Sequence, residues 1–333
     1  MLTFIESSGI DSLLKTFFPT ERLSWKSLDK GLLNQNILVE AQAGRYLLKI
    51  YRPEVTSQDL QEIHQVMEFV GARGIPVPKL VNHLETTNGQ GVGLYTFLPG
   101  KNPSRYSSAV SRVANVGDML GRIHVSLEEY RETFNKELTA QDPALPTKEE
   151  KLEKIEKLID QAKHDQPPQY EELIRLLTEQ AKRLASRNWD VQVFDTLPRH
   201  LCHGDFHTKN ILCKGNKVTG VLDWEKTGWG GHAYEVMRSI VYNCCRAPGN
   251  FNWQSIQAYI RAYRQHQTLT PLECELAFPF VFQKLIFGTW MEEQYLKGRP
   301  EVWENVIRRC TMNAYLFKHE KRIAERIQSL LSA

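Results

Sequence analysis

The stretch that decides the fold reads His203-Gly204-Asp205-Phe206-His207-Thr208-Lys209-Asn210 and is followed by Gly220-Val221-Leu222-Asp223-Trp224. Two short apolar runs, 210–213 and 218–222, adjoin the polar residues and predict two short strands. Because unpaired carboxylates are costly to bury beside strands, we expect Asp205 and Asp223 to have a chemical role. Two carboxylates and the amide oxygen of Asn210 suit a hard cation such as Mg²⁺. A carboxylate that stays free of the metal can accept a proton from an attacking hydroxyl group.

Upstream of this stretch the chain predicts a small sheet that carries one helix. Five short apolar runs are separated by turn residues, at 23–28, 36–41, 45–51, 79–81 and 92–97. Between the third and fourth runs, apolar residues recur at helical spacing and predict an amphipathic helix over 58–72. Pro76 and Pro78 prevent that helix from continuing.

The segment 98–104 contains two prolines and a glycine and interrupts the periodicity. A chain of 333 residues also exceeds the size at which one hydrophobic core keeps growing. We therefore predict two domains, an N-terminal one at 1–98 and a C-terminal one at 99–333. Beyond the break the patterns are mostly helical, and Pro167-Pro168 separates two helices of a predicted hairpin.

Composition excludes several classes of protein. Apolar residues make up 41% and charged residues 24%, which is ordinary for a globular protein. The net charge of +3 is too small for a dedicated nucleic-acid binder, and no apolar run approaches the roughly 20 residues that span a bilayer. The six cysteines form no Cys-x-x-Cys pair, so we expect reduced, mostly buried thiols and no zinc site. These features predict a cytoplasmic protein with no nucleic-acid or membrane partner.

The motif His203-Gly204-Asp205-x-x-x-x-Asn210, with Asp223 eighteen residues after Asp205, resembles the aminoglycoside phosphotransferase and choline kinase group. The resemblance covers residues from about 20 onward and is weakest over 140–195. It implies an α+β, two-lobed protein-kinase-like fold, in which a small antiparallel sheet with one main helix precedes a larger helical lobe. The first domain is then the nucleotide-binding lobe, and the second carries the catalytic loop, the metal site and the acceptor pocket.

The resemblance implies roles for individual residues. Asp205 matches the catalytic aspartate, and Asn210 and Asp223 match the residues that hold Mg²⁺ against the ATP phosphates. Lys49 lies inside an apolar strand and needs a partner, which phosphate oxygens and a helix carboxylate would supply. Glu62, at the edge of the sheet-facing stripe of the predicted helix, is the expected carboxylate.

The same resemblance places the nucleotide between two further segments. The turn at 29–36 is expected to cover the phosphates, with Gly31 and the Asn34 amide as contacts, although it has only one glycine. The residues Thr96, Phe97 and Leu98 resemble the hinge that receives the adenine through backbone hydrogen bonds.

Acidic residues of the helical part are candidates for binding an amino group of the acceptor. Glu225 and Glu235 are named for this role, although an exposed helix face contains similar residues. Glu235 also stands where the family has an aspartate that braces the catalytic loop.

These observations favour an ATP- and Mg²⁺-dependent phosphotransferase that acts on a hydroxyl of a small molecule. The acceptor stays open among aminoglycosides, amino alcohols such as homoserine or choline, and sugars. The segments 194–198 and 220–223 resemble homoserine-kinase-type members. A non-catalytic kinase-fold scaffold is the alternative, and the absence of an Ala-Pro-Glu segment after Asp223 disfavours a protein kinase. The protein is expected to be a monomer or a homodimer.

Overall fold

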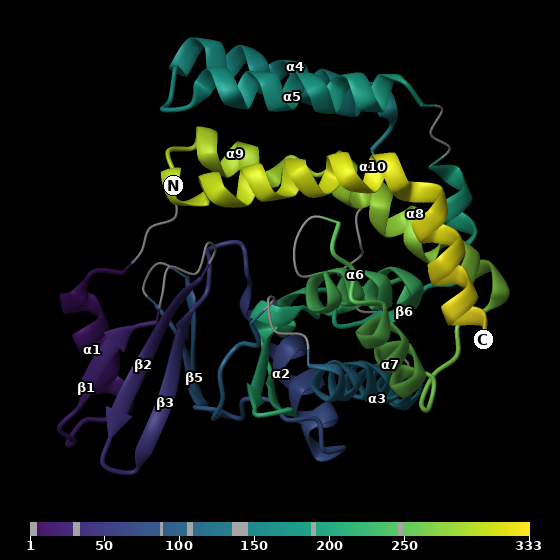
Figure 1. The fold of residues 1–333 in the computed structure, drawn as a ribbon. Coiled ribbons are helices and arrows are strands. Elements are labelled where there is room, and N and C mark those ends of the chain that lie inside the picture. The colour runs from purple at the N-terminus through teal and green to yellow at the C-terminus, as the bar shows by residue number, and fades with distance from the viewer. Residues whose placement is uncertain are drawn as a thin grey trace.

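The computed structural model describes residues 5–28, 34–86, 89–104, 109–134, 146–187, 191–245 and 249–333. A small sheet lies at one end of the molecule, and the later helices form the larger part (Figure 1). The sheet contains β1 (Ser24–Ser27), β2 (Gln35–Ala41), β3 (Gly44–Ile50), β4 (Leu80–Glu85) and β5 (Gly91–Thr96). The strands pair antiparallel in the order β1-β2-β3-β5-β4. The predicted α+β fold with a small antiparallel sheet is therefore confirmed.

The two faces of the sheet have different neighbours. Helix α1 (Ser7–Phe17) covers one face, where Leu48 and Ile50 of β3 join its apolar side chains in one core cluster. Because side chains alternate along a strand, Lys49 points to the opposite face, toward the helical part of the molecule. Sequence analysis did not predict α1, whose buried Ile10 and Leu14 stand four residues apart on one side of the helix.

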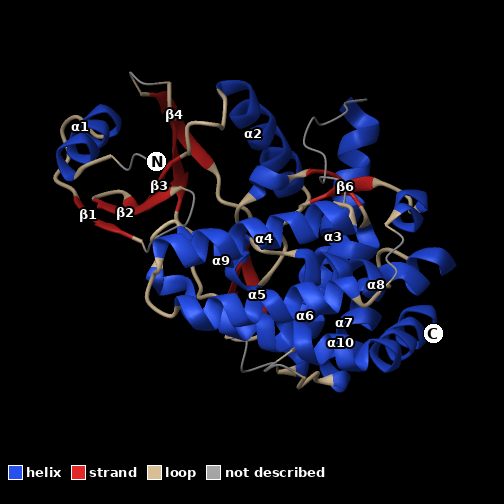
Figure 2. Ribbon diagram, turned by 90° about the horizontal axis from the view of Figure 1, so that it is seen from above, coloured by secondary structure: helices blue, strands red, loops and turns tan. Residues whose placement is uncertain are grey.

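Helix α2 (Ser57–Ala72) follows β3 and matches the predicted helix over 58–72. Thr56 and Asp59 form a capping box at its N-terminus, which satisfies two backbone donors. Viewed from above, α2 lies between the sheet and helix α3 (Val110–Phe134) (Figure 2). The side chains of Ile63 and Met67 therefore reach the cleft between the sheet and the helices.

The larger part is built from helices and two small hairpin-like sheets. Its helices are α3, α4 (Lys148–Asp165), α5 (Tyr170–Ala185), α6 (His232–Cys244), α7 (Trp253–Tyr263), α8 (Pro271–Phe287), α9 (Trp290–Leu296) and α10 (Trp303–Ser332). Strands β7 (Ile211–Lys214) and β8 (Lys217–Val221) pair with each other, as do β6 (His200–Cys202) and β9 (Gly228–Gly230). These short strands flank the polar stretch 203–210 and lead to Asp223.

The predicted helical hairpin is α4 and α5, which lie side by side above α9 and α10 (Figure 1). All six cysteines are buried and free, as expected. Among the described residues, none of the helices is both long and apolar enough to cross a membrane.

The hairpin is attached through a buried lysine. Lys151 of α4 is 5% exposed, and its Nζ donates a hydrogen bond to Thr289 Oγ1 at 2.9 Å. Burial and the neighbouring Lys154 lower the pKa of Lys151 to about 8. A buried ammonium with so little compensation weakens the attachment.

We predict that Lys151→Met raises the free energy of unfolding at pH 7 by about 1–2 kcal/mol. In the folded protein Lys151 loses its proton near pH 8, whereas in the unfolded chain it does so near pH 10.5. Between these pH values the unfolded state binds more protons than the folded state. The free energy of unfolding of the wild type therefore rises with pH relative to that of the variant. Urea unfolding of both proteins from pH 7 to pH 10.5 should show the difference shrink. A difference that stays constant over this range would contradict the prediction.

Candidate active site

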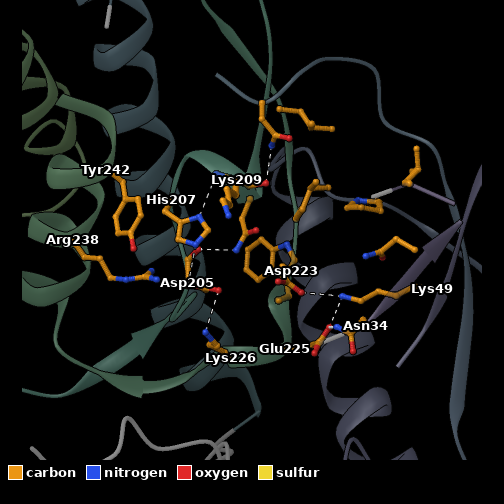
Figure 3. Close-up of a pocket in the computed structure, with 18 of the residues that line it drawn as sticks. Asn34, Lys49, Asp205, His207, Lys209, Asp223, Glu225, Lys226, Arg238 and Tyr242 are labelled. Carbon is orange, nitrogen blue, oxygen red and sulfur yellow. Dashed lines mark hydrogen bonds and ion pairs between the residues drawn. The ribbon is translucent and has the colours of Figure 1, made fainter. Parts of the chain in front are cut away.

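A cleft of about 1180 Å³ separates the sheet from the helices. From the sheet side it is lined by Asn34, Lys49 and the segment Thr96, Phe97 and Leu98. From the opposite side it is lined by the polar stretch, which contributes Asp205, Asn210, Asp223 and Glu225. The structure therefore brings most of the sequence-predicted site residues together in one cavity (Figure 3).

Lys49 is held by two carboxylates from the segment that follows β8. Its Nζ lies 2.9 Å from Asp223 Oδ1 and also contacts Glu225 Oε1. Burial by itself would lower the pKa of Lys49, but the two carboxylates raise it above its ordinary value, so the ammonium stays charged. Burial would raise the pKa of Asp223, and Lys49 instead holds it below its ordinary value. The cluster thus has one positive and two negative charges.

Asp223 has an unusual backbone conformation that directs it into this cluster. It follows β8 with φ of 65° and ψ of 63°, the left-handed region that few residues other than glycine adopt. Such a conformation costs about 1–3 kcal/mol and is typical of functional sites. The turn it makes starts the short helix Trp224–Lys226, which carries Glu225 and Lys226 into the cleft.

The prediction that Glu62 pairs with Lys49 is wrong in this structure. Glu62 accepts a hydrogen bond from Gln58 Nε2 at 3.1 Å, and together with burial it raises the pKa of Tyr130 on α3. The reason is helical phase: Ile63 and Met67 face the cleft, and Glu62 is turned toward α3.

Neutral side chains lie behind Lys49 in place of a helix carboxylate. The Tyr51 and Tyr95 hydroxyls are 2.6 Å apart, and Tyr95 also lies 2.6 Å from His64 Nε2 of α2. The Nζ of Lys49 lies 4.8 Å from the centroid of the Tyr51 ring, a cation–π distance. The link from α2 to the site is therefore a chain of aromatic side chains.

Asp205 lies at the centre of a second cluster. Its Oδ1 accepts from Arg238 Nη2 at 2.5 Å, and its Oδ2 accepts from Lys226 Nζ at 3.2 Å. His207 Nε2 lies 3.4 Å from Oδ1. Burial would raise the pKa of Asp205, but the cationic neighbours, Arg238 foremost, hold it well below its usual range. Asp205 is therefore an ionised carboxylate at neutral pH.

Backbone contacts tie this loop to the strand that carries Asp223. His203 Nε2 donates to the Leu222 carbonyl at 3.0 Å, and its Nδ1 accepts from the Asp205 N–H at 3.2 Å. Asn210 Nδ2 donates to the Asp205 carbonyl at 3.0 Å, which leaves the amide oxygen as its acceptor end. A side chain at Gly204, where φ is 80°, would come within 2.1 Å of the Lys226 carbonyl oxygen, so only glycine fits there.

The proposal that Glu235 contacts the acceptor is wrong, because this residue is 2% exposed and does not line the cleft. Its Oε2 accepts from the His203 N–H at 3.1 Å and from His124 Nε2 at 3.0 Å. Burial lowers the pKa of His124 to about 3, so the ring is neutral, and its Nδ1 lies 2.9 Å from the Tyr263 hydroxyl. Glu235 thus braces the loop 203–210 from within the core.

The remaining predicted residues belong to the segments 29–36 and 96–98, and those that the structure describes lie at the sheet side of the cleft. Asn34 Nδ2 donates to Glu225 Oε1 at 2.6 Å, and its Oδ1 accepts from the Arg52 N–H at 3.0 Å. Gly31 lies outside the described residues. Thr96, Phe97 and Leu98 line the cleft where β5 ends, and their contact with adenine stays a prediction.

Four residues that shape the site were not predicted from the sequence. Arg238 and Lys226 contact Asp205, and His124 supports Glu235. Asn102, in the break between the lobes, donates from Nδ2 to the Lys209 carbonyl at 2.7 Å and to the Ile211 carbonyl at 2.9 Å. Arg238 follows Glu235 by three residues, one helical turn, and this spacing was the available signal.

Lys49 and Glu225 should be energetically coupled, because together with Asn34 they connect the sheet to the catalytic segment. For Lys49→Met, Glu225→Gln and the double variant, we predict a coupling in the free energy of unfolding of about 1–3 kcal/mol. The exposed pair Lys157 and Glu153 of α4, 2.6 Å apart, serves as the control and should show less than about 0.5 kcal/mol. If the losses in the free energy of unfolding from Lys49→Met and Glu225→Gln simply add in the double variant, the two side chains are not coupled and the prediction is wrong.

Glu235→Ala should lower the free energy of unfolding by about 2–4 kcal/mol, because it leaves two buried donors without an acceptor. Glu235→Gln should cost less, since its amide oxygen can still accept from the His203 N–H. Glu275→Ala, on an exposed position of α8, is the control and should change stability by less than about 0.5 kcal/mol. The measurement is chemical denaturation, and equal losses for the variants at 235 and 275 would refute the brace.

Comparisons with known proteins agree with this architecture. The chain is 24% identical over 296 residues to the homoserine kinase of Methylobacillus flagellatus, covering 87% of this chain and 85% of the relative. It is 25% identical over 281 residues to the homoserine kinase of Caulobacter vibrioides, covering 82% of each.

Solved structures show the same fold. The GDP complex of aminoglycoside 2'-phosphotransferase-IIIa superimposes with a TM-score of 0.58 at 14% identity, over 93% of this chain and 98% of that one. Plasmodium vivax ethanolamine kinase gives a TM-score of 0.61 at 14% identity, over 96% of this chain and 93% of that one. The two-lobed kinase-like fold is thereby confirmed. A family model described as the phosphotransferase enzyme family matches residues 24–269, which is most of the chain, and the protein therefore belongs to this family.

Proposed function

We propose that this protein is an ATP- and Mg²⁺-dependent phosphotransferase that moves the γ-phosphoryl group of ATP to a hydroxyl of a small molecule. The observation that carries the proposal is the arrangement of Asp205, Asn210, Asp223 and Lys49 around one cleft. Its relatives are named as kinases, and solved structures of similar fold contain GDP or ADP. This supports nucleotide binding in the cleft.

The sheet side of the cleft suits the nucleotide. The apolar side chains of Leu28, Leu47 and Leu222 line the cavity next to Thr96, Phe97 and Leu98, where an adenine ring would lie against the hinge. The Lys49 ammonium, at the far end of β3, would meet the phosphates. Asn34, which donates a hydrogen bond to Glu225 in the same cluster, would contact them as well.

The donor set beside Lys49 fits a magnesium ion. Asp223 and Asn210 would hold the ion through a carboxylate and an amide oxygen, and Glu225 lies next to them in the same cluster. The cluster's excess of negative charge is consistent with a cation ligand. When bound, the ion would neutralise charge on the ATP phosphates.

The protein's own residues supply the rest of the chemistry. The Asp205 carboxylate, ionised at neutral pH, would accept a hydrogen bond from the acceptor hydroxyl and orient its oxygen for in-line attack. Lys226 comes from the segment after Asp223 and contacts Asp205, so its ammonium lies beside the carboxylate that the transferred group would approach (Figure 3). Its positive charge would stabilise the negative charge on that group.

A kinase-fold scaffold remains the alternative to an enzyme. A scaffold has no need for an ionised carboxylate held by two cations at the end of a cleft, and every predicted catalytic and metal position is retained here. The geometry therefore favours catalysis.

The proposal is tested by ADP release with Mg-ATP and an acceptor panel that includes homoserine, ethanolamine, choline, aminoglycosides and hexosamines. We predict that Asp205→Asn lowers kcat by about 10²–10⁴-fold, since it removes the proton acceptor. The stabilisation by Mg-ATP in thermal unfolding should remain. Asp160→Asn, on the exposed face of α4, is the matched control and should keep the wild-type rate. An Asp205→Asn protein with the parent rate would refute the assignment, and absence of both turnover and stabilisation would favour the scaffold.

A further inference from the structure

The end of the cleft beyond Asp205 is rich in positive charge. We call this part the acceptor side; it is formed by α6, α9 and α10 and lined by Arg238, Tyr242, Trp290, Met291, Asn305 and Arg308. Lys226 and His207 adjoin it next to Asp205. Among the described lining residues, the other carboxylates, Asp223 and Glu225, are engaged by Lys49.

The charges around Asp205 do not balance. Arg238 and Lys226 each bring one positive charge, against a single carboxylate. His207 adds none at neutral pH, because burial and Arg238 lower its pKa to about 4. Arg309, another lining residue, is already neutralised by the buried Glu292. The acceptor side therefore carries a surplus positive charge where the acceptor hydroxyl would enter.

Arg238 is the cation best placed to bind an anion in the acceptor side. Its side chain is 16% exposed, and its guanidinium carbon lies 5.3 Å from the centroid of the Tyr242 ring. Nη2 donates to Asp205, but Nη1 is buried without a hydrogen-bond partner among the described residues. In Figure 3, Arg238, Tyr242 and His207 lie on the side of Asp205 away from Lys49. Nη1 itself is covered, so an anion would meet the exposed part of the side chain, which lines the cleft, and a partly buried guanidinium there is suited to an additional anion.

We propose that the acceptor carries an anionic group, a carboxylate or a phosphate, in addition to its hydroxyl, and that Arg238 binds this group. The inference rests on the proposed function and specifies its substrate class. Guanidinium matches both anions through paired N–H donors. A polycationic or quaternary ammonium acceptor would meet like charge here and be disfavoured.

Binding of the anion also explains how Asp205 becomes available. Without an acceptor, Arg238 and Lys226 occupy both oxygens of the Asp205 carboxylate. An anionic group that takes over the Arg238 donors would free Oδ1 to accept a hydrogen bond from the hydroxyl. An acceptor without the anion would have to compete with Arg238 for Asp205.

Matched acceptors that differ in the anion test the proposal. The carboxylate arm compares L-homoserine with 3-aminopropan-1-ol and L-serine with ethanolamine, and the phosphate arm compares glycerol 3-phosphate with glycerol. We expect kcat/KM for the anionic member to exceed that of its partner at least tenfold in one arm, which identifies the anion. Preference for the non-anionic member in every pair that reacts would overturn the inference.

Variants at Arg238 separate binding of the anion from support of Asp205. Because Arg238 also holds Asp205, Arg238→Gln should slow both members of a pair, but it should lower kcat/KM for the anionic acceptor at least tenfold more than for its non-anionic partner, through a higher KM. Arg238→Lys, which keeps the charge, should lie between. Arg175→Gln, at an exposed arginine of α5 paired with Glu172, should change neither. Equal losses for both members of a pair in Arg238→Gln would show that Arg238 serves only Asp205, and would overturn the inference.

A binding measurement distinguishes this inference from the proposed function. In thermal unfolding with Mg-ADP, the anionic acceptors should stabilise the wild type and not Arg238→Gln. Stabilisation by Mg-ADP without any further effect of the three anionic acceptors would overturn the inference alone. Absence of stabilisation by Mg-ADP and by Mg-ATP, together with no turnover, would overturn the proposed function itself.

Discussion

The contact of Lys49 with Asp223 and Glu225 is the interaction on which the site depends. Lys49 belongs to the middle of the sheet, and the two carboxylates belong to the turn after β8. The contact holds the two sides of the cleft at a fixed distance before any ligand binds. The contact depends on the strained backbone of Asp223, because the left-handed turn there directs the carboxylate toward Lys49 rather than along the strand.

The two clusters have opposite charge, and this contrast organises the cleft. The cluster at Lys49 has an excess of one negative charge, which favours a cation beside the nucleotide phosphates. The cluster at Asp205 has an excess of one positive charge. A transferred phosphoryl group would thus move from the side that holds a cation toward the side that supplies fixed positive charge. Such fixed charges lower a barrier because they need no rearrangement during the reaction.

Local patterns predicted the strands, α2, the α4–α5 hairpin and most of the residues that meet in the cleft. These features depend on the spacing of apolar residues and on short motifs, and both can be read from residues that are close together in the sequence. Contacts between distant segments were not predictable in the same way. Glu62 was expected to reach Lys49, but a helix rotates by 100° per residue and its neighbour Ile63 takes the inward position. A glutamate such as Glu235 is usually found at the surface. Its burial is explained by its hydrogen bond with His124, which is 111 residues away in the chain and could not be inferred from neighbouring residues. Arg238 and Lys226 were missed for the same reason.

Among the described contacts of Lys49 there is no carboxylate from α2. This affects how a movement of α2 would change the site. Where a helix carboxylate anchors the strand lysine, movement of that helix releases the lysine. Here the anchor is Glu225, two residues beyond Asp223, and α2 contributes His64 through the Tyr51 and Tyr95 hydroxyls. A displacement of α2 would then break a neutral hydrogen bond and leave both ion pairs of Lys49 intact. The Lys49 end of the site is therefore built as part of the segment that carries Asp223 and Glu225, and its geometry is set by the turn at Asp223 rather than by the position of α2.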